Sequence, residues 1–378
     1  MPRTGFLKIN TLKIIDLFSG VGGLSLGAAR AGFDVHAAVE LDAKASAAHA
    51  VNFPSSAHIR EDISRLSGRE LTRLAGIATK EIVGVIGGPP CQGFSDIGLR
   101  SAHDPRNELL CDFFRLVAET EPAFFLAENV PGALSERNAS LLSRALATVP
   151  KRYTIIKPFV VKASDYGAPT IRTRVFFYGF DPERCSPLTA KDFLPQGTED
   201  VRVQDALAEL PAIRSAWQSE DQGWRCVGEL GKSAFFDRIT SHVPIGVGNP
   251  AALSRLRKNR EVSGFLGTIH SQKTVRRFKK LRPGESDSVS KCVRLDPTGY
   301  CPTLRAGTGP ERGSYQAIRP VHPRSPRVIS PREGARLQGF PDWFQFDATK
   351  WHSFRQIGNS VSPIVAEILL STIKRSLT

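Results

Sequence analysis

Apolar runs alternate with helical stretches through the first half of the chain, and this alternation leaves few fold classes open. The runs cover residues 13–18, 33–40, 81–88 and 123–129. Runs of this length with few polar positions are typical of parallel strands that are buried on both faces. The stretch 107–120, between the last two runs, has the apolar spacing of a helix. We therefore expect an α/β domain built on a doubly wound, Rossmann-like sheet.

The pattern changes after residue 180. Two more strands are expected at 153–161 and 174–180, which completes a first domain over residues 1–180. From 181 to about 320, Pro, Gly and Ser are frequent and periodic segments are few, so we expect a second, smaller and irregular domain over 181–320, with mostly short strands. A length of 378 residues suits two lobes of this kind.

The C-terminal segment 321–378 is expected to return to the first domain. Amphipathic helices are predicted at 330–340 and 367–377, with apolar faces that need a partner surface. Three charged side chains of the first of these helices are expected to form ion pairs that hold the two lobes together: Arg332, Glu333 and Arg336.

The charge of the chain favours a polyanionic partner. Lys and Arg number 51 against 37 Asp and Glu, which gives a formal charge of +14 at pH 7, and nucleic acid leads the list of partners for such a balance. Ten Lys or Arg and one acid lie between residues 251 and 282. A solvated face is the simplest explanation of such a run. Because Phe265, His270 and Phe278 interleave with the basic residues, we expect a phosphate-tracking surface instead.

Neither a membrane segment nor a secretion signal is indicated. No stretch approaches the roughly 18–20 consecutive apolar residues needed to span a bilayer, and the N-terminal sequence lacks an apolar core followed by a cleavage site. We therefore expect a cytoplasmic protein. The six cysteines include no C-x-x-C pair, so neither a disulfide framework nor a zinc site is indicated and no metal is expected.

A glycine loop follows the first expected strand. Gly20, Gly22 and Gly23 allow the backbone to turn sharply and to approach a ligand closely. Glu40, at the carboxyl end of the second strand, is placed to accept hydrogen bonds from ribose hydroxyls, and Asp62 could recognise an adenine amine. These residues leave a dinucleotide, an adenosyl cofactor and a purely structural turn open, and a nicotinamide enzyme among them.

The sequence GGPPCQGFS at residues 87–95 narrows the choice. Cys91 follows a buried strand, so it lies on a loop at the carboxyl edge of the sheet, where α/β proteins place their reacting groups. Pro89 and Pro90 restrict the backbone before it and would hold the thiol in a defined pose. A small buried cysteine is the alternative, but such a residue needs neither two prolines before it nor the polar Gln92 after it. The pattern favours a nucleophile.

With these residues in place, the chain resembles the cytosine-C5 DNA methyltransferases of the bacterial modification type. The family's motifs occur in order, namely DLFSGVGG from Asp16, then Glu40, Asp62, PPCQGFS, the ENV triplet at Glu128, Arg172 with Arg174, REGARLQGFPD and QIGNSVSP. PPCQGFS and ENV together are highly specific, whereas the glycine loop is shared with many nucleotide-binding proteins. The resemblance implies a methyltransferase sheet domain dependent on S-adenosyl-L-methionine and a target-recognition domain at 181–320.

The resemblance also implies a set of cofactor-binding residues. Asn359 and Ser360 are expected at the N-terminus of the last helix, where they would help to bind the methionine part, although simple capping of that helix explains them as well. The cofactor-binding residues carried over from the family's motifs are Asp16, Phe18, Gly20, Gly22, Gly23, Leu24, Glu40, Leu41, Asp62, Ile63, Gly88, Pro90, Asn359 and Ser360.

The chemistry that the family performs requires a thiolate. Cys91 would add to C6 of cytosine and make C5 nucleophilic enough to take the methyl group. Glu128 would hydrogen-bond N3 and the exocyclic amine and neutralise the charge that builds on the ring. Arg172 and Arg174 would stabilise the flipped base and the catalytic loop, with a salt bridge at a strand edge as the alternative. The sequence does not identify the base that removes the C5 proton.

Double-stranded DNA is the partner that the resemblance implies. A cytosine in a duplex must leave the stack to meet a thiolate. The DNA-binding candidates are Gln92, Ser95, Arg100, Arg255, Arg257, Lys279 and Lys280. We expect a monomer that protects DNA as the modification arm of a restriction system, with a cognate endonuclease as a possible partner. One departure from the family is Thr170, where Gln is usual, which puts a loop-anchoring contact in doubt.

Three other functions remain open. A related enzyme type methylates a tRNA cytosine with the same motifs, but the CFT triplet of that branch is absent here. A silent DNA-binding protein with this fold should have lost Cys91 or Glu128, and this chain has both. An oxidoreductase would explain the glycine loop but not PPCQGFS.

Overall fold

The computed structural model describes residues 11–90, 108–213, 223–229, 231–307 and 319–378. An eight-stranded sheet lies at its centre, with the path β3-β2-β1-β4-β5-β8-β6 and β7 also paired with β8. The first five strands along the chain are parallel, and β8 is antiparallel to β5, β6 and β7. The strands are β1 Lys13–Leu17, β2 Asp34–Val39, β3 Ala57–Ile59, β4 Ile82–Gly87, β5 Phe124–Asn129, β6 Thr154–Ile155, β7 Phe159–Lys162 and β8 Thr173–Phe180. The predicted α/β sheet is confirmed.

One predicted strand is divided. The run 153–161 was expected to form a single strand, but β6 and β7 are separate and pair with different parts of β8. Pro158 lies between them. A proline has no N–H to donate to the ladder, so it interrupts a strand at the position where that donor is needed.

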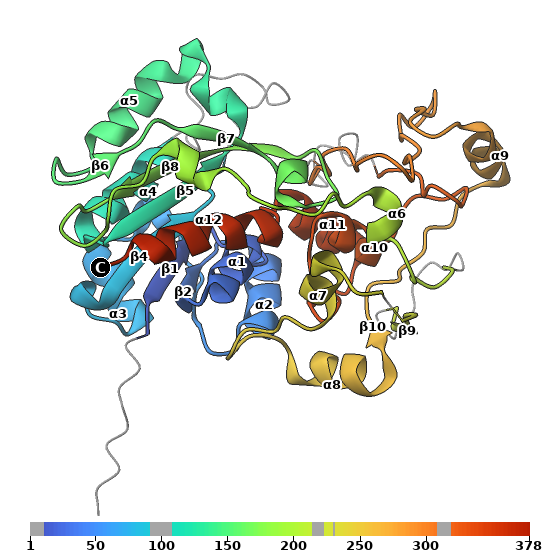
Figure 1. Cartoon of the computed structure of the whole chain (residues 1–378), viewed down its shortest axis with the longest axis horizontal. Coiled ribbons are helices and arrows are strands. Elements are labelled where there is room, and N and C mark those ends of the chain that lie inside the picture. The colour runs from blue at the N-terminus through green and yellow to red at the C-terminus, as the bar shows by residue number, and fades with distance from the viewer. Residues whose placement is uncertain (1–10, 91–107, 214–222, 230, 308–318) are drawn as a thin grey trace, which may run out of the picture.

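Helices cover both faces of the sheet (Figure 1). Successive strand residues point to opposite faces, and Ile14 packs in the core on one side while Ile15 packs in the core on the other. The first core includes α1 and α12, and the second includes α3, α4 and α5. The helices of this domain are α1 Gly23–Ala31, α2 Ala43–Asn52, α3 Gly68–Ala75, α4 Glu108–Thr120, α5 Ala139–Ala147, α10 Pro331–Leu337, α11 Lys350–Asn359 and α12 Pro363–Ser376. Single turns of 3-10 helix lie at Ile63–Arg65, Thr79–Glu81, Pro131–Leu134, Glu136–Asn138, Ala163–Tyr166 and Ala190–Phe193.

The first and last helices of the sheet domain are in close contact (Figure 1). A Cβ atom on Gly27 of α1 would lie 2.2 Å from the Cβ of Ala366 in α12, so only glycine permits this approach. Residues at the two ends of the chain therefore share one core, and α12 packs on the first domain as the amphipathic pattern indicates.

The C-terminal segment contains a helix that the sequence analysis missed. Asn359 is the last residue of α11 and Ser360 is its C-cap, so neither residue lies at the N-terminus of the last helix, where we expected both. That N-terminus has Ser362 at the N-cap and Pro363 at the first helical position. The proline was the better start signal, because its fixed φ suits the first turn of a helix.

The region 181–320 is built of short helices more than of strands. Its described residues form α6 Val203–Ala206, α7 Ala234–Thr240, α8 Pro250–Asn259 and α9 Gln272–Lys280, with one pair of two-residue strands, β9 Arg225–Cys226 and β10 Glu261–Val262. The expectation of mostly short strands was wrong. The helical spacing was present: Phe235 and Ile239, four residues apart, are both buried in the core that α1 and α12 share.

Buried arginines of α10 connect this region to the C-terminal segment. Arg336 forms an ion pair with Asp342 at 2.7 Å and donates a hydrogen bond to the carbonyl oxygen of Ala208 at 2.7 Å. Arg332 donates to the carbonyl oxygen of Ser263 at 2.8 Å. Glu333 pairs with Arg327 of its own segment. The expected ion pairs of Arg336 and Glu333 are present but lie within the C-terminal segment, and Arg332 and Arg336 reach the 181–320 region through hydrogen bonds to backbone carbonyl oxygens.

Candidate active site

Four strand ends bring the predicted residues to one edge of the sheet. In the parallel register Leu17 of β1 faces Val39 of β2 on one side and Gly87 of β4 on the other. The residues that follow these three positions, including Glu40 and Gly88, therefore emerge side by side at the carboxyl edge.

The Glu40 carboxylate is fixed by the glycine loop. Its Oε2 atom accepts a hydrogen bond from the backbone N–H of Gly20 at 2.9 Å, and its Oε1 atom accepts one from Asp42 at 2.7 Å. Burial raises the pKa of Glu40, and these two backbone hydrogen bonds oppose that rise. The loop bends through left-handed conformations at Phe18, with φ of 60°, and at Gly20, with φ of 56°. The carboxylate is thus held at the loop rather than swinging in solvent.

The three glycines of the loop have different surroundings. A Cβ atom on Gly22 would lie 2.5 Å from the ring of Phe53, and one on Gly23 would lie 2.3 Å from the carbonyl oxygen of Val361. A Cβ atom on Gly20 would meet nothing within 4 Å. The open space that a ligand needs is therefore at Gly20, while Gly22 and Gly23 make room for the protein itself.

Gly23→Ala tests this packing. Gly23 is the first residue of α1, so alanine suits its backbone, but the new methyl group must push the Val361 backbone away from the loop. We expect the free energy of unfolding to fall by about 1–3 kcal/mol, the usual cost of overpacking, in urea titrations monitored by circular dichroism. An unchanged midpoint would mean that the segment around Val361 does not rest on the loop in solution.

The remaining cofactor candidates line or support the same edge. Leu41 is 60% exposed beside Glu40, which leaves an apolar side chain uncovered at the carboxyl edge. Asp62 accepts hydrogen bonds from the backbone N–H and the hydroxyl of Ser64, and these bonds lower its pKa. Leu24 and Ile63 are buried and act as support. Such an arrangement suits a nucleoside, with an apolar surface for a base and a carboxylate for a ribose.

Glu128 at the end of β5 is paired with Arg174 of β8. Arg174 Nε lies 2.6 Å from Glu128 Oε1, and both side chains are largely buried. A Cβ atom on Gly88 would lie 3.1 Å from Glu128 Oε2. Asn129 donates a hydrogen bond to the carbonyl oxygen of Pro89 at 3.3 Å. The ENV triplet and the start of the proline loop are therefore in contact.

Four of the predicted residues lie at positions 91–100, directly after Pro90 in the sequence. Cys91, Gln92, Ser95 and Arg100 lie outside the described residues. Pro90, the residue before Cys91, is described and half-buried beside the same edge.

The hydrogen-bond partners of Arg172 differ from the partner of Arg174. Arg172 is buried and donates hydrogen bonds to the carbonyl oxygens of Gly358 at 2.9 Å and of Asn359 at 3.3 Å. It also donates to Leu304 at 3.3 Å. The two arginines were expected to act together, but Arg174 pairs with Glu128, whereas Arg172 ties the end of α11 to the sheet domain. Asn359 itself is exposed, and Ser360 is buried.

Thr170 does make an anchoring contact. Its hydroxyl donates to the carbonyl oxygen of Cys301 at 3.0 Å, and the two residues form a parallel β-bridge. The shorter side chain therefore joins the loop before β8 to the segment around Cys301.

The aromatic residues of the basic stretch are not exposed for stacking. Phe265 and Phe278 are 3% and 1% exposed and belong to small apolar cores of the second region. The ring of His270 packs edge-on against Phe278 at 5.3 Å. The interleaving of aromatic and basic residues, from which we expected a phosphate-tracking surface, therefore reflects aromatic side chains that pack inside the second region.

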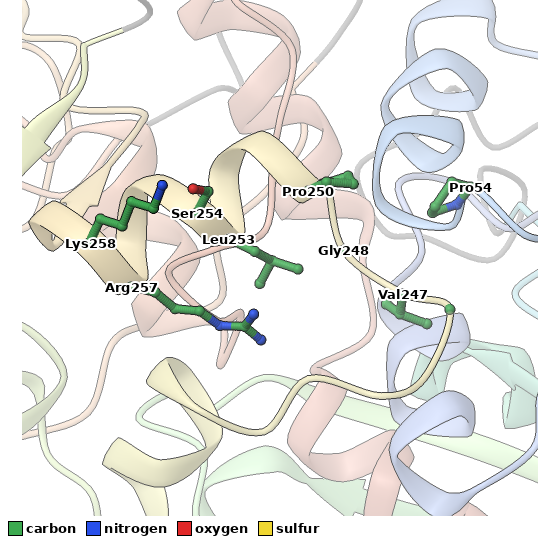
Figure 2. Close-up of a pocket in the computed structure, with 9 residues that line it drawn as sticks. Pro54, Val247, Gly248, Pro250, Leu253, Ser254, Arg257 and Lys258 are labelled. Atoms are coloured by element: carbon green, nitrogen blue, oxygen red, sulfur yellow. The ribbon is translucent and has the colours of Figure 1, made fainter.

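The basic candidates lie at different places. Lys279 and Lys280 are exposed on α9. The guanidinium of Arg255 packs on the ring of Trp224 at 4.5 Å. Arg257 and Lys258 of α8 line a pocket of about 510 Å³ together with Pro54 (Figure 2). Pro54 precedes β3, so this pocket lies at the amino edge of the sheet, away from Glu128.

Comparisons with known proteins agree with one another. The family model for C-5 cytosine-specific DNA methylase matches residues 12–375. The Type II methyltransferase M.XorII of Xanthomonas oryzae pv. oryzae is 39% identical over 367 residues, covering 96% of this chain and 84% of that protein. M.DdeI of Desulfomicrobium norvegicum is 31% identical over 402 residues, covering 96% of this chain and 88% of that protein.

Solved structures show the same relationship. A crystal structure from E. coli, described as a prophage-encoded DNA modification methyltransferase, is 48% identical with a TM-score of 0.87 and covers 97% of this chain and 99% of that chain. The S. pombe Dnmt2 methyltransferase, 17% identical with a TM-score of 0.61 over 97% of this chain and 98% of that chain, shares the fold. Among the described residues, no helix is long and apolar enough to cross a membrane, and no group of three or more His, Cys, Asp or Glu side chains is arranged to hold a metal ion. With the family model spanning almost its whole length, this chain belongs to the C-5 cytosine-specific DNA methylases and is a DNA cytosine methyltransferase.

Proposed function

We propose that this enzyme transfers a methyl group from S-adenosyl-L-methionine to C5 of a flipped cytosine within a short sequence of double-stranded DNA. One observation carries the proposal. Glu128, paired with Arg174, adjoins the proline loop that leads to Cys91, at the same sheet edge as the Gly20–Glu40 contact. A polar group for a base and a nucleoside site for a methyl donor thus lie at the same edge of the sheet, with only β4 between the strands β1 and β5.

The residues at the edge fit the methyl donor. Glu40 offers a carboxylate for ribose hydroxyls, Leu41 an exposed apolar side chain for adenine, and Gly20 an open space next to the Glu40 carboxylate. The buried oxygens Asp16 Oδ1 and Ser19 Oγ have no hydrogen-bond partner among the described residues, which supports a polar ligand at this loop. The cofactor, when bound, supplies an electrophilic methyl group on a sulfonium.

Three side chains have separate roles in the reaction of cytosine. The Cys91 thiolate adds to C6, which makes C5 nucleophilic, and C5 takes the methyl group. Glu128 hydrogen-bonds N3 and the exocyclic amine and neutralises the ring charge during the addition, while Arg174 holds the Glu128 carboxylate in place. Loss of the C5 proton and elimination of the thiolate release methylated cytosine and regenerate Cys91.

Double-stranded DNA must supply enough contact energy to offset removal of the base from the stack, which costs a few kcal/mol. We assign part of this contact to α9. Arg277 and Phe278 anchor the helix, through an ion pair with Asp287 at 2.9 Å and through burial, while Lys279 and Lys280 are exposed. The helix thus offers free cationic ends on a fixed support.

Neutralising Lys279 and Lys280 to glutamine should weaken DNA binding at every sequence. Each phosphate contact that is lost should reduce the slope of log K against log salt by about 0.9, so a total reduction of about 1–2 is expected, measured by fluorescence anisotropy over a salt series. Lys80→Gln with Lys151→Gln removes the same charge from exposed residues near the amino edge of the sheet and should leave the slope almost unchanged. Equal slopes for wild type and the α9 variant would refute the assignment.

The relatives suggest a biological role. The curated relatives named above are Type II methyltransferases, and we propose that this protein is the protective arm of a restriction system, acting as a cytoplasmic monomer with a cognate endonuclease as its counterpart.

The activity is tested by transfer of a labelled methyl group. The purified enzyme is incubated with S-adenosyl-L-methionine carrying a labelled methyl group and with duplex DNA or tRNA. Label recovered as 5-methylcytosine in the duplex supports the proposal, and label in tRNA alone would contradict it.

A further inference from the structure

A chain of hydrogen bonds runs from beneath the glycine loop towards the surface. Asp16 of β1 is fully buried and contacts the hydroxyl of Ser25 in α1 through its Oδ2 atom. His49 of α2, also fully buried, places Nε2 3.0 Å from Ser25 Oγ. His49 Nδ1 lies 2.9 Å from Nε2 of His58, which is half-buried on β3. The four side chains come from four elements, so the fold itself assembles the chain.

The hydrogen bonds that link His58 to Asp16 can all point inward or all point outward. A hydroxyl and a neutral imidazole can each donate one hydrogen bond and accept another. With the donors pointing inward from His58, the chain ends on an ionised Asp16. With the donors pointing outward, Asp16 donates to Ser25 and is neutral. The chain is therefore satisfied in both protonation states of Asp16, and it can move a proton between this carboxyl and the surface.

The charges around Asp16 favour easy protonation. Burial raises the pKa of Asp16 to about 7, the Ser25 hydrogen bond opposes the rise and the nearby Glu40 adds to it. Burial holds the pKa of His49 well below its usual value, with His58 adding to that effect, so the relay is neutral. Glu40 in turn faces Asp42 and Arg355, and the adjoining strand β4 is Ile82–Gly87, IVGVIG, with no titratable side chain.

The same residues support the cofactor loop. Asp16 precedes Phe18 by two residues, and its Oδ1 atom has no hydrogen-bond partner among the described residues. A Cβ atom on Gly22 would lie 3.0 Å from the His49 ring, which stacks on Phe53 at 4.3 Å. A change of charge at Asp16 therefore occurs directly under the loop.

We propose that Asp16 is a specificity-determining residue that favours the cationic sulfonium of the methyl donor over the neutral thioether of the product, with Ser25 and His49 as positioning residues that carry its proton. The inference rests on the proposed function, because it requires this methyl donor. An ionised Asp16 attracts a sulfonium and is indifferent to a thioether. Loss of the methyl group removes the positive charge of the ligand, and Asp16 then takes up a proton through the hydrogen-bond chain. Asp16 therefore adds nothing to the affinity for the product, which depends on its other contacts alone.

Binding of the two ligands tests the proposal without any turnover. Affinities of S-adenosylmethionine and S-adenosylhomocysteine are measured by calorimetry from pH 6 to 8 for wild type, Asp16→Asn, His49→Phe and Ser25→Ala. Phenylalanine keeps a ring beside Phe53 but removes both hydrogen bonds of His49. In wild type, the preference for the sulfonium should rise with pH by a factor on the order of ten, the usual size of such a coupling inside a protein.

The variants separate this effect from a structural one. In Asp16→Asn, the ratio of the two affinities should not change with pH. Any small change caused by titration of the ligands' own amino groups should also occur in wild type. In His49→Phe and Ser25→Ala, the rise of the affinity ratio should occur at higher pH, because the ionised form of Asp16 loses the hydrogen bonds that stabilise it. A structural defect would weaken both ligands equally and leave their ratio unchanged. The same rise in Asp16→Asn, or no rise in wild type, overturns the inference alone, whereas failure of both ligands to bind wild type overturns the proposed function with it.

Discussion

Serine in place of Cys91 is expected to lower methyl transfer to DNA by about 10³-fold or more, while cofactor and DNA binding persist. The substitution changes one atom, and a serine hydroxyl has far too high a pKa to act as an anion at neutral pH. Without addition to C6, the C5 carbon of cytosine is too poor a nucleophile to take a methyl group. Single-turnover transfer rates, with separate binding titrations for the cofactor and DNA, measure both parts of the expectation.

A matched variant tests whether the loss of methyl transfer is specific to Cys91. Cys226 is an exposed free thiol on β9, so Cys226→Ser makes the same change of atom outside the eight-stranded sheet. It should transfer methyl groups at the wild-type rate. Turnover by Cys91→Ser within a few-fold of wild type would remove the covalent step from the mechanism.

Glu128→Gln is expected to lower the transfer rate by about 10²–10⁴-fold, the usual contribution of a positioned acid or base. Glutamine keeps the size of the side chain and can place its amide oxygen beside Arg174, so the substitution removes the carboxyl chemistry more than the packing. The neutral amide cannot supply or hold a proton at N3. The fall should therefore be in the rate of the chemical step, with DNA affinity changed little.

A second buried ion pair provides the control. Glu333 of α10 is buried, like Glu128, and pairs with Arg327 at 2.7 Å in the C-terminal segment. Glu333→Gln should lower stability, since it leaves Arg327 with a weakened partner, but the folded fraction should keep its turnover. Equal losses of turnover in the two variants would mean that Glu128 acts through stability alone.

The parallel half of the sheet could be predicted from the sequence because its signals are local. Strands β1, β2, β4 and β5 are short apolar runs, and the helices between them begin and end at recognisable residues such as Gly32, which adopts the left-handed conformation after α1. Parallel strands then bring their carboxyl ends together without further information, so the proximity of Gly20, Glu40 and Gly88 follows from topology.

Other features could not be predicted because long-range packing decides them. The burial of Phe278 depends on apolar residues such as Val321 and Val328, more than 40 residues away in sequence. The division of labour between Arg172 and Arg174 depends on where the end of α11 docks, which no pattern near residue 172 reveals. Three local signals were present and overlooked: Pro158 between β6 and β7, Pro363 at the start of α12, and the helical spacing of Phe235 and Ile239 in α7.

The hydrogen-bonded polar residues beneath the glycine loop are another feature that long-range packing decides. Ser25 and His49 lie on helices whose sequences show no sign of a buried polar cluster, and His58 lies on a strand of three residues. Their contact with Asp16 arises only when four elements pack together. A buried carboxyl next to a glycine loop was the one sequence feature that could have prompted a search for its partners.

Bisulfite sequencing tests the central claim most directly. Plasmid DNA is taken from a host without cytosine methylation of its own that expresses either this protein or its Cys91→Ser form. The account predicts cytosines protected from conversion within one recurring short sequence for the wild-type protein, and complete conversion for the variant. Complete conversion for both, with soluble protein present in each case, would contradict the proposal that this enzyme methylates C5 of cytosine in DNA through Cys91.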